Sequence, residues 1–153
     1  MLAHTLGFPR VGLDRELKKG LEAYWKGERS EADLLSLARE LRHRHWELQQ
    51  QQGIDLIPVG DFSLYDHVLD TTAMLGAVPQ RFNWSGAQVD LPTYFRMARG
   101  EGGIAAMEMS KWFDTNYHYL VPEFYPGQTF KLSSTGALFA TINRVATPAG
   151  KSR

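Results

Sequence analysis

The sequence has no cysteine among its 153 residues. This absence excludes disulfide bonds, thiolate nucleophiles and zinc sites held by thiolates within these residues. Seventeen basic and seventeen acidic residues give a formal net charge of zero. The chain therefore lacks the excess of positive charge by which nucleic-acid-binding proteins attract a polyanion, and we expect no nucleic-acid partner.

Long apolar runs are also missing. No run approaches the roughly 20 apolar residues that a membrane-spanning helix needs. The first four residues do not form the charged start of a secretion signal. We expect a cytoplasmic protein without a membrane partner. The residues that are present, 43% apolar and 22% charged, have the composition of one globular domain.

Hydrophobic spacing and turn residues predict strands that alternate with helices. Three short apolar segments are predicted strands, at residues 2–6, 54–59 and 117–121, and the second is expected to be buried on both faces. Helical spacing predicts helices over about 14–26, 31–52, 64–75, 91–99 and 104–114. This order is typical of a parallel α/β sheet, either doubly wound or closed into a barrel.

Two groups of polar residues are candidates for chemistry. Arg15, Lys18 and Lys19 lie in the first turns of the first predicted helix, where free N–H groups and the helix dipole favour anions. Lys111 is expected near the end of the last predicted helix, just before a strand. The residues alone favour a solvated helix face in the first case and an exposed lysine at a packed junction in the second.

A third group follows the second predicted strand. It comprises Asp61, Asp66, His67 and Asp70, and barrel sites gather at this end of a strand. The pattern indicates no further metal ligand. A helix cap at Asp61 or Ser63 explains the acidic residue there equally well.

Four blocks of sequence resemble, in the same order, the amino-terminal part of cobalamin-independent methionine synthases. They are residues 4–12, 15–19, 53–62 and 111–124, and the likeness covers about residues 4–131. The resemblance implies an α/β fold, an incomplete (β/α)8 TIM-type barrel made of the first strands and helices. A whole barrel needs about 250 residues. We therefore expect a partial barrel domain over residues 1–132 and an aberrant or disordered basic tail over 133–153.

The family resemblance also implies a reaction. The whole enzyme moves the methyl group of 5-methyltetrahydrofolate, which carries a polyglutamate tail, to homocysteine and so forms methionine. The residues that match the family's folate site are Arg15, Glu16, Leu17, Lys18 and Lys111. Several separated cations suit a string of carboxylates, because Arg binds a carboxylate with two hydrogen bonds and Lys binds as a point charge.

The resemblance places a zinc ion in the carboxyl-terminal barrel of the family, where it activates the thiol of homocysteine. Nothing in this chain matches that zinc site. We therefore expect no metal, no cofactor and no catalytic residue in this chain, and an isolated chain that is inactive.

A hypothesis from another class stays open beside the methyltransferase. The chain would then be a non-catalytic module that binds a polyanion or a partner protein through residues 15–19 and an exposed sheet edge. In either case an open arc of parallel strands leaves backbone groups uncovered at its edges. We expect the isolated chain to be marginally stable or to associate with itself.

Overall fold

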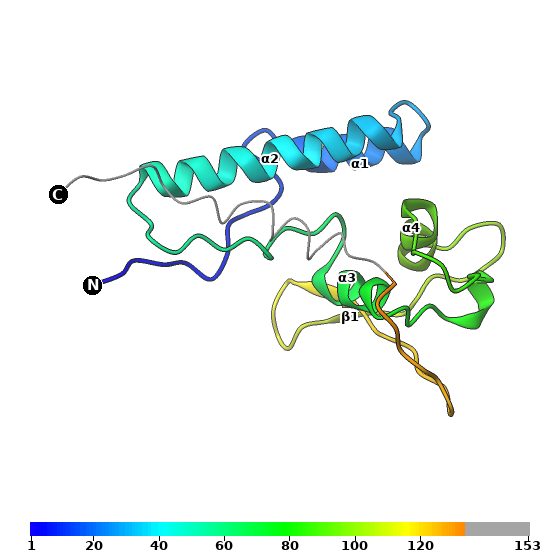
Figure 1. Cartoon of the computed structure of the whole chain (residues 1–153). Helices are drawn as coiled ribbons and strands as arrows, with labels where there is room; N and C mark the ends of the chain where they lie inside the picture. Colours follow the sequence, from blue (N-terminus) through cyan, green and yellow to red (C-terminus); the bar gives the residue numbers. More distant parts are fainter. Residues whose placement is uncertain (134–153) are drawn as a thin grey trace.

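The computed structural model of the chain describes residues 1–133, which form two layers (Figure 1). One layer is a helix pair, α1 (Glu16–Trp25) and α2 (Glu31–Gln51). The other contains α3 (His67–Met74), the 3-10 helix η1 (Gln80–Phe82), α4 (Leu91–Arg99) and the strands β1 (Met109–Lys111) and β2 (His118–Leu120). This is a mixed helix and strand architecture with a small open sheet. The tail expected after residue 132 lies, except for Ser133, outside the described residues.

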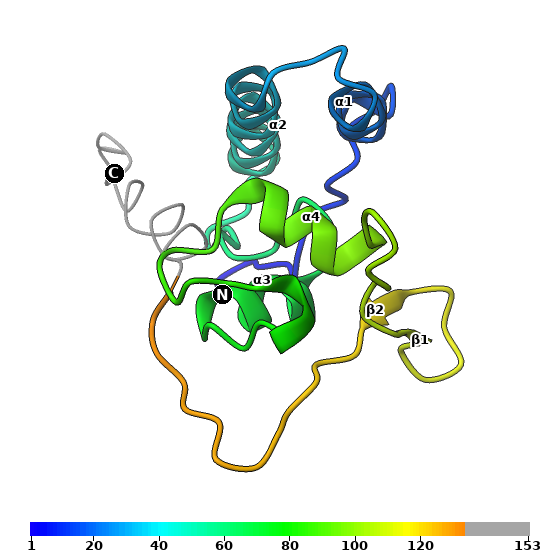
Figure 2. The ribbon, with the colours of Figure 1, turned by 90° about the vertical axis from the view of Figure 1, so that its right-hand side faces the viewer.

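The helix pair is held by close packing of α1 on α2, which lie side by side in Figure 2. Leu17 of α1 and Leu34 of α2 belong to the buried core. Gly20 is also buried, and a Cβ added there would lie 2.4 Å from Cδ2 of Leu37. The helices therefore approach so closely that a side chain at position 20 would have to displace the end of the Leu37 side chain.

Polar side chains mark the starts of the helices, and α2 and α4 begin where the sequence predicts. The Ser30 hydroxyl accepts a hydrogen bond from the Asp33 N–H, and the Asp90 carboxylate accepts one from the Thr93 N–H. The helix expected from residue 64 instead begins at His67, because Asp66 is its cap. The predictions of a cap at Asp61 or Ser63 were therefore wrong.

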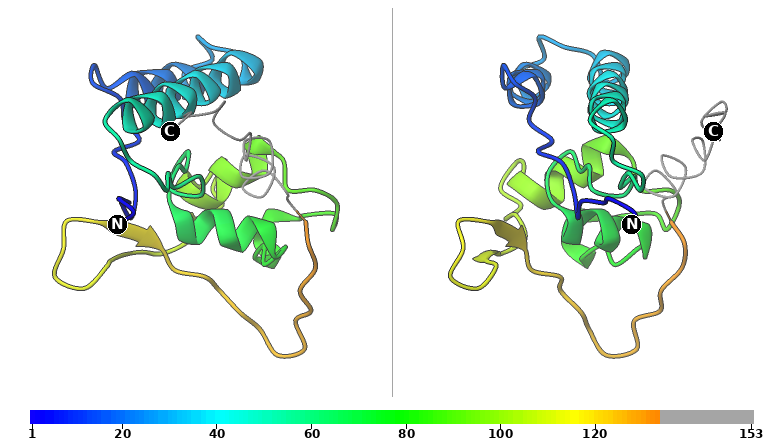
Figure 3. Two further views of the ribbon diagram at one scale, coloured as in Figure 1. Left: turned by 60° about the vertical axis from the view of Figure 1, so that its left-hand side comes forward. Right: turned by 90° about the vertical axis from the view of Figure 1, so that its left-hand side faces the viewer.

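The amino-terminal segment extends from the start of α1 toward the second layer. It lies beside the segment that follows α2 (Figure 3). His4 and Leu56 form a parallel β-bridge, so the predicted direction is confirmed. Neither segment is a regular strand, because side chains supply part of the bonding: carboxylates of the second segment accept the N–H groups of Ala3 and Phe8 at 2.8 and 2.7 Å.

The expectation that residues 54–59 are buried on both faces was wrong. The Trp46 indole of α2 donates to the Pro58 carbonyl from one side, at 3.1 Å. Leu56, by contrast, keeps 55% of its surface exposed. Residues 1–133 therefore cover this segment on one side only.

The prediction of a helix over residues 104–114 was also wrong. Glu101 and Ile104 close a tight turn, and the chain then runs extended into β1. Its backbone groups form hydrogen bonds with other parts of the chain. Arg81 donates to the carbonyls of Ala105 and Ala106, and the Met107 N–H donates to the last turn of α4. These tertiary hydrogen bonds replace the bonds of a helix.

The strand expected at residues 117–121 is confirmed as β2. Its partner is β1, which pairs with it antiparallel in the register Met109 with Leu120 and Lys111 with His118. The two strands form a hairpin because the turn residues 112–117 lie between them. The third strand thus belongs to a local hairpin, and not to a parallel sheet with the earlier segments.

Aromatic rings join the two layers. The Phe95 ring of α4 lies 5.5 Å from the rings of both Tyr24 and Trp25 on α1, measured between ring centroids. The core continues through the second layer, where Leu69, Phe82 and Leu120 are almost fully buried. Among the helices that the structure describes, none has both the length and the apolar character to cross a membrane.

We predict that Asp66→Ala destabilises the fold more than Asp90→Ala. Asp66 is 2% exposed and accepts hydrogen bonds from the N–H groups of Val68, Leu69 and Leu120. We expect a loss of about 2–4 kcal/mol for Asp66→Ala and about 1 kcal/mol for Asp90→Ala, which removes a helix cap alone. Urea unfolding followed by circular dichroism measures both values. Equal losses would show that the Leu120 contact contributes nothing.

Candidate functional site

The structure brings four of the predicted site residues together at the start of α1. Arg15 precedes the helix with a left-handed backbone, φ 59°, which is uncommon for a residue with a side chain. The Glu16 carboxylate accepts the Asp14 N–H at 3.0 Å and pairs with Arg44 of α2 at 2.5 Å. The hydrogen bond from Arg44 lowers the pKa of Glu16. Glu16 therefore fastens the helix start, while Arg15 remains exposed.

Leu17 and Lys18 have different surroundings in the same turn. Leu17 is 2% exposed and belongs to the core. Lys18 is half-exposed and lies 3.8 Å from Glu22. Both line a pocket of about 320 Å³, which we call the α1 pocket. Its other lining residues are Arg10, Val11, Leu21, Glu22, Trp25, Leu64 and Tyr65.

Lys111 lies elsewhere, on β1 opposite His118, and its side chain is exposed. It is a strand residue and does not follow a helix, contrary to the sequence prediction. The β1–β2 hairpin and α1 are clearly separated in Figures 1 and 2. Lys111 is absent from the lining of the α1 pocket. The structure thus groups Arg15 to Lys18 and leaves Lys111 apart from them.

The hairpin around Lys111 carries a cluster of aromatic rings. The Trp112 ring lies 5.3 Å from the Phe113 ring and 5.6 Å from the Tyr119 ring, with edge-on geometry in both pairs. Phe113 has a positive φ of 52° and is 81% exposed. The structure places Phe113 at the surface, beside the strand that holds Lys111.

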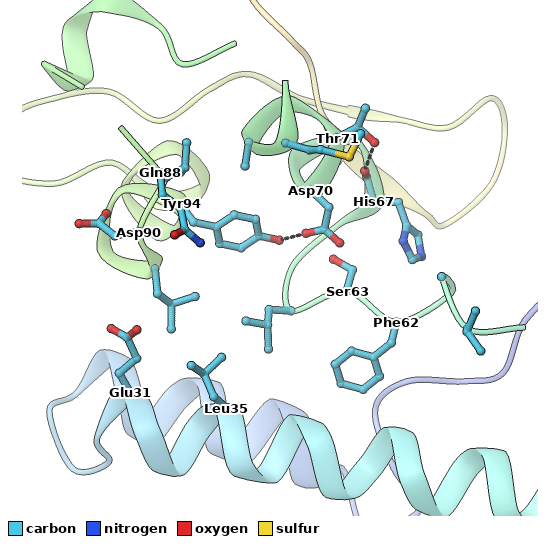
Figure 4. A pocket seen from close by; sticks show the side chains of 17 residues that line it. Glu31, Leu35, Phe62, Ser63, His67, Asp70, Thr71, Gln88, Asp90 and Tyr94 are labelled. Atoms are coloured by element: carbon cyan, nitrogen blue, oxygen red, sulfur yellow. Dashed lines mark hydrogen bonds between the residues drawn. The ribbon is translucent and has the colours of Figure 1, made fainter. Parts of the chain in front are cut away.

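A second pocket, of about 600 Å³, lies between α2 and the second layer (Figure 4). We call it the central pocket. The Tyr94 hydroxyl donates to the Asp70 carboxylate at 2.6 Å, and the Tyr65 N–H donates to the Tyr94 oxygen. Burial raises the pKa of Asp70 and raises the pKa of Tyr94 well above its usual value. Sequence reasoning singled out Asp70 by its place after a strand, but nothing in the pattern indicated its tyrosine partner.

The acidic residues after the second predicted strand do not form a metal site. Asp61 binds the Phe8 N–H, Asp66 caps α3, and Asp70 binds Tyr94. Within residues 1–133 no three His, Asp or Glu side chains gather as metal ligands would. Each carboxylate has a structural partner instead.

A comparison with protein families matches residues 2–151 to the family described as "Cobalamin-independent synthase, N-terminal domain". The match continues past Leu132, where the resemblance was expected to fade. Similar curated proteins are named 5-methyltetrahydropteroyltriglutamate–homocysteine methyltransferase. The relative from Syntrophotalea carbinolica is 68% identical over 136 residues, and that from Acidithiobacillus ferrooxidans is 60% identical over 142. A third, from Yersinia enterocolitica, is 57% identical over 142 residues.

These alignments cover most of this chain but little of each relative. They include 87%, 93% and 90% of the chain, in the order given, and 18%, 18% and 19% of the relatives. The chain therefore spans about a fifth of the length of the proteins that it matches.

We predict that Asp70 makes the fold less stable as the pH rises. Its folded pKa lies above the value of 3.8 for a free carboxyl. Between the free and the folded value, the unfolded chain ionises while the folded chain keeps its proton, so stability falls with increasing pH. Asp70→Asn should remove this loss. Urea unfolding from about pH 3.5 to pH 7 measures it, and we expect the stability of the variant relative to the parent to increase with pH.

The matched control is Asp114→Asn, at an exposed position on the hairpin. It should leave the difference from the parent almost constant with pH. Parallel curves for Asp70→Asn and the parent would contradict the prediction.

Proposed function

The chain belongs to the family of cobalamin-independent methionine synthases, and we propose that it forms part of a methyltransferase. The reaction moves the methyl group of 5-methyltetrahydrofolate, with its polyglutamate tail, to homocysteine and yields methionine. The observation that carries this proposal is the 68% identity, over 136 residues, to a 5-methyltetrahydropteroyltriglutamate–homocysteine methyltransferase. This chain supplies part of the folate site in the cytoplasm.

The fold in this proposal is an incomplete (β/α)8 barrel over residues 1–132. Its support is the parallel bridge between His4 and Leu56, with the helix pair in the connection between them. A strand, a helical crossover and a parallel strand make the repeating unit of such barrels. Zinc and homocysteine belong to the remainder of the enzyme, and the isolated chain is inactive.

The folate tail is bound by cations on two elements. Arg15 and Lys18 hold carboxylates at the start of α1, where the helix dipole adds to their charge. Glu16 and Leu17 position this turn through Arg44 and the core. Lys111 binds from the hairpin, so it meets a different part of the ligand. A ligand with several carboxylates suits cations that are separated in this way.

A second candidate function is a non-catalytic module that binds a polyanion or a partner protein. One observation favours it: the side chains of Arg15, Lys19 and Lys111 are exposed. Such a module uses the same exposed cations without selecting folate. Its affinity follows the charge of the ligand alone.

We predict that the chain binds 5-methyltetrahydropteroyltriglutamate more tightly than the monoglutamate, because the longer tail offers more carboxylates. Lys18→Ala and Lys111→Ala should each weaken triglutamate binding by roughly threefold to tenfold, and added salt should weaken it further. Isothermal titration calorimetry measures these affinities. Lys26→Ala, at an exposed position beyond the end of α1, is the control. Equal affinity for unrelated polyanions of the same charge would favour the module instead.

We also predict that the isolated chain associates with itself or unfolds with low cooperativity. Large apolar side chains lie exposed on the described residues, among them Leu6, Leu13, Leu56, Phe124 and Phe130. Exposed apolar surface of this extent favours association. Sedimentation at several concentrations should show an average mass that rises with concentration. A strict monomer with a cooperative thermal transition would contradict this prediction.

A further inference from the structure

The carboxylate of Glu16 is bonded on both of its oxygens. One oxygen lies 2.5 Å from Nη2 of Arg44 on α2, and the other accepts the Asp14 N–H at 3.0 Å. Among the ion pairs of the described residues, the pair of Glu16 and Arg44 is the one that joins α1 to α2. The acid thus links the second helix to the residues that lead into the first.

The loop before α1 is shaped around this carboxylate. Gly12 has a left-handed backbone, with φ 84°, and a Cβ added there would overlap Oε2 of Glu16. The loop turns back on itself at this point, since the Arg15 N–H donates to the Gly12 carbonyl at 3.2 Å. Glycine adopts this conformation without strain and leaves the space that the acid occupies. The position of the Glu16 carboxylate and the path of the backbone into Arg15 are therefore coupled.

Arg44 also determines which charges remain for a ligand. Arg15 and Lys18 are exposed cations close to Glu16 in the same turn, and an acid without a partner there would compete with an anionic ligand. The hydrogen bond from Arg44 lowers the pKa of Glu16, so the acid stays ionised beside its partner on α2. Glu16 forms no ion pair with Arg15 or Lys18 among the described residues. Lys18 lies 3.8 Å from Glu22, but water screens this pair because both side chains are half-exposed.

We propose that Arg44 is a positioning residue of the folate site and that it acts through Glu16. By binding the carboxylate of Glu16, it leaves Arg15 and Lys18 for the anionic part of the folate. The same contact fixes the loop from which the Arg15 side chain extends. The inference rests on the proposed function, and it gives α2 a role in a site whose cations lie on α1 and on the hairpin.

The test is a double-mutant cycle on the full chain, with 5-methyltetrahydropteroyltriglutamate as the ligand and calorimetry at low salt as the measurement. Arg44→Gln should weaken binding roughly threefold to tenfold, because the Glu16 carboxylate then lies without its partner beside the cations. Glu16→Gln removes the charge and keeps an acceptor for the Asp14 N–H. In this background Arg44→Gln should change the affinity by roughly twofold or less, because no acid remains for Arg44 to bind.

Two further variants serve as rescue and control. Arg44→Lys keeps the positive charge and should retain most of the affinity, with a small loss because an ammonium lacks the fork of the guanidinium. Arg39→Gln removes an exposed arginine from the same helix, and Arg39 has no ion-pair partner within residues 1–133. It should change the affinity by roughly twofold or less, because salt and water screen an exposed charge outside the site.

The outcomes separate this inference from the proposed function. Equal losses for Arg44→Gln with Glu16 and with Gln at position 16 would overturn the inference, because Arg44 would then act without the acid. No loss in either background, together with a clear loss for Lys18→Ala, would overturn it and leave the folate site standing. If the chain does not bind the triglutamate, both the inference and the proposed function are overturned.

A titration of the Glu16 carboxyl carbon by NMR needs no ligand. Its resonance is assigned by its absence in Glu16→Gln. Because the hydrogen bond from Arg44 lowers the pKa of Glu16, the carboxyl should titrate at a higher pH in Arg44→Gln than in the parent, and Arg39→Gln should leave it unchanged. An unchanged titration in Arg44→Gln would show that the two side chains are not coupled and would overturn the inference.

Discussion

The carboxylate of Asp66 is the contact on which the second layer depends. One oxygen accepts the first free N–H groups of α3, and the other accepts the N–H of Leu120 in β2. A single buried side chain therefore fixes where α3 begins and where the hairpin docks. Burying a charge is costly unless it is fully hydrogen-bonded, and this carboxylate is bonded on both oxygens. Nearby acids act in the same way: Asp55 and Asp61 bind backbone N–H groups of the amino-terminal segment.

This use of carboxylates explains how a chain of balanced charge keeps exposed cations at the start of α1. Most acids around the first residues are occupied by the backbone or by α2, as Glu16 is by Arg44. Cations such as Arg15 have no such structural partner among the described residues. A net charge of zero thus conceals a local surplus of positive charge at the start of α1. The composition excludes a strong electrostatic field over the whole chain. It does not report a surplus of positive charge over one turn of a helix.

Local signals in the sequence predicted the elements that local physics determines. Ser30 and Asp90 bond to backbone within their own helices, so their patterns were sufficient to place α2 and α4. Asp66 also caps locally, but Asp61 or Ser63 was the expected cap, and the burial of Asp66 against β2 decided the outcome. The prediction of a helix from Ile104 to Lys111 failed for the opposite reason. Its backbone bonds to Arg81 and Met97, which are distant in sequence, and no periodicity in the stretch reports such partners.

The residues of the candidate site likewise include some that the sequence predicted and some that it did not. The cations of α1 were predictable together because one helical turn carries them, and the family resemblance assigned them to one site with Lys111, which lies on a separate element. The pocket with Arg10, Trp25 and Tyr65 was not predictable, because these residues come from three segments that meet only in the fold. The buried pair of Asp70 and Tyr94 was missed for the same reason.

Gly20 has a consequence for how the first helix can move. With no side chain between the backbones, Leu37 of α2 occupies the space beside it. A larger residue at position 20 would have to displace this side chain, so the packing of α1 on α2 is close at this point. Arg15 and Lys18 are therefore carried by a helix that is formed and packed without a ligand. Association then incurs little entropic penalty from ordering the helix itself.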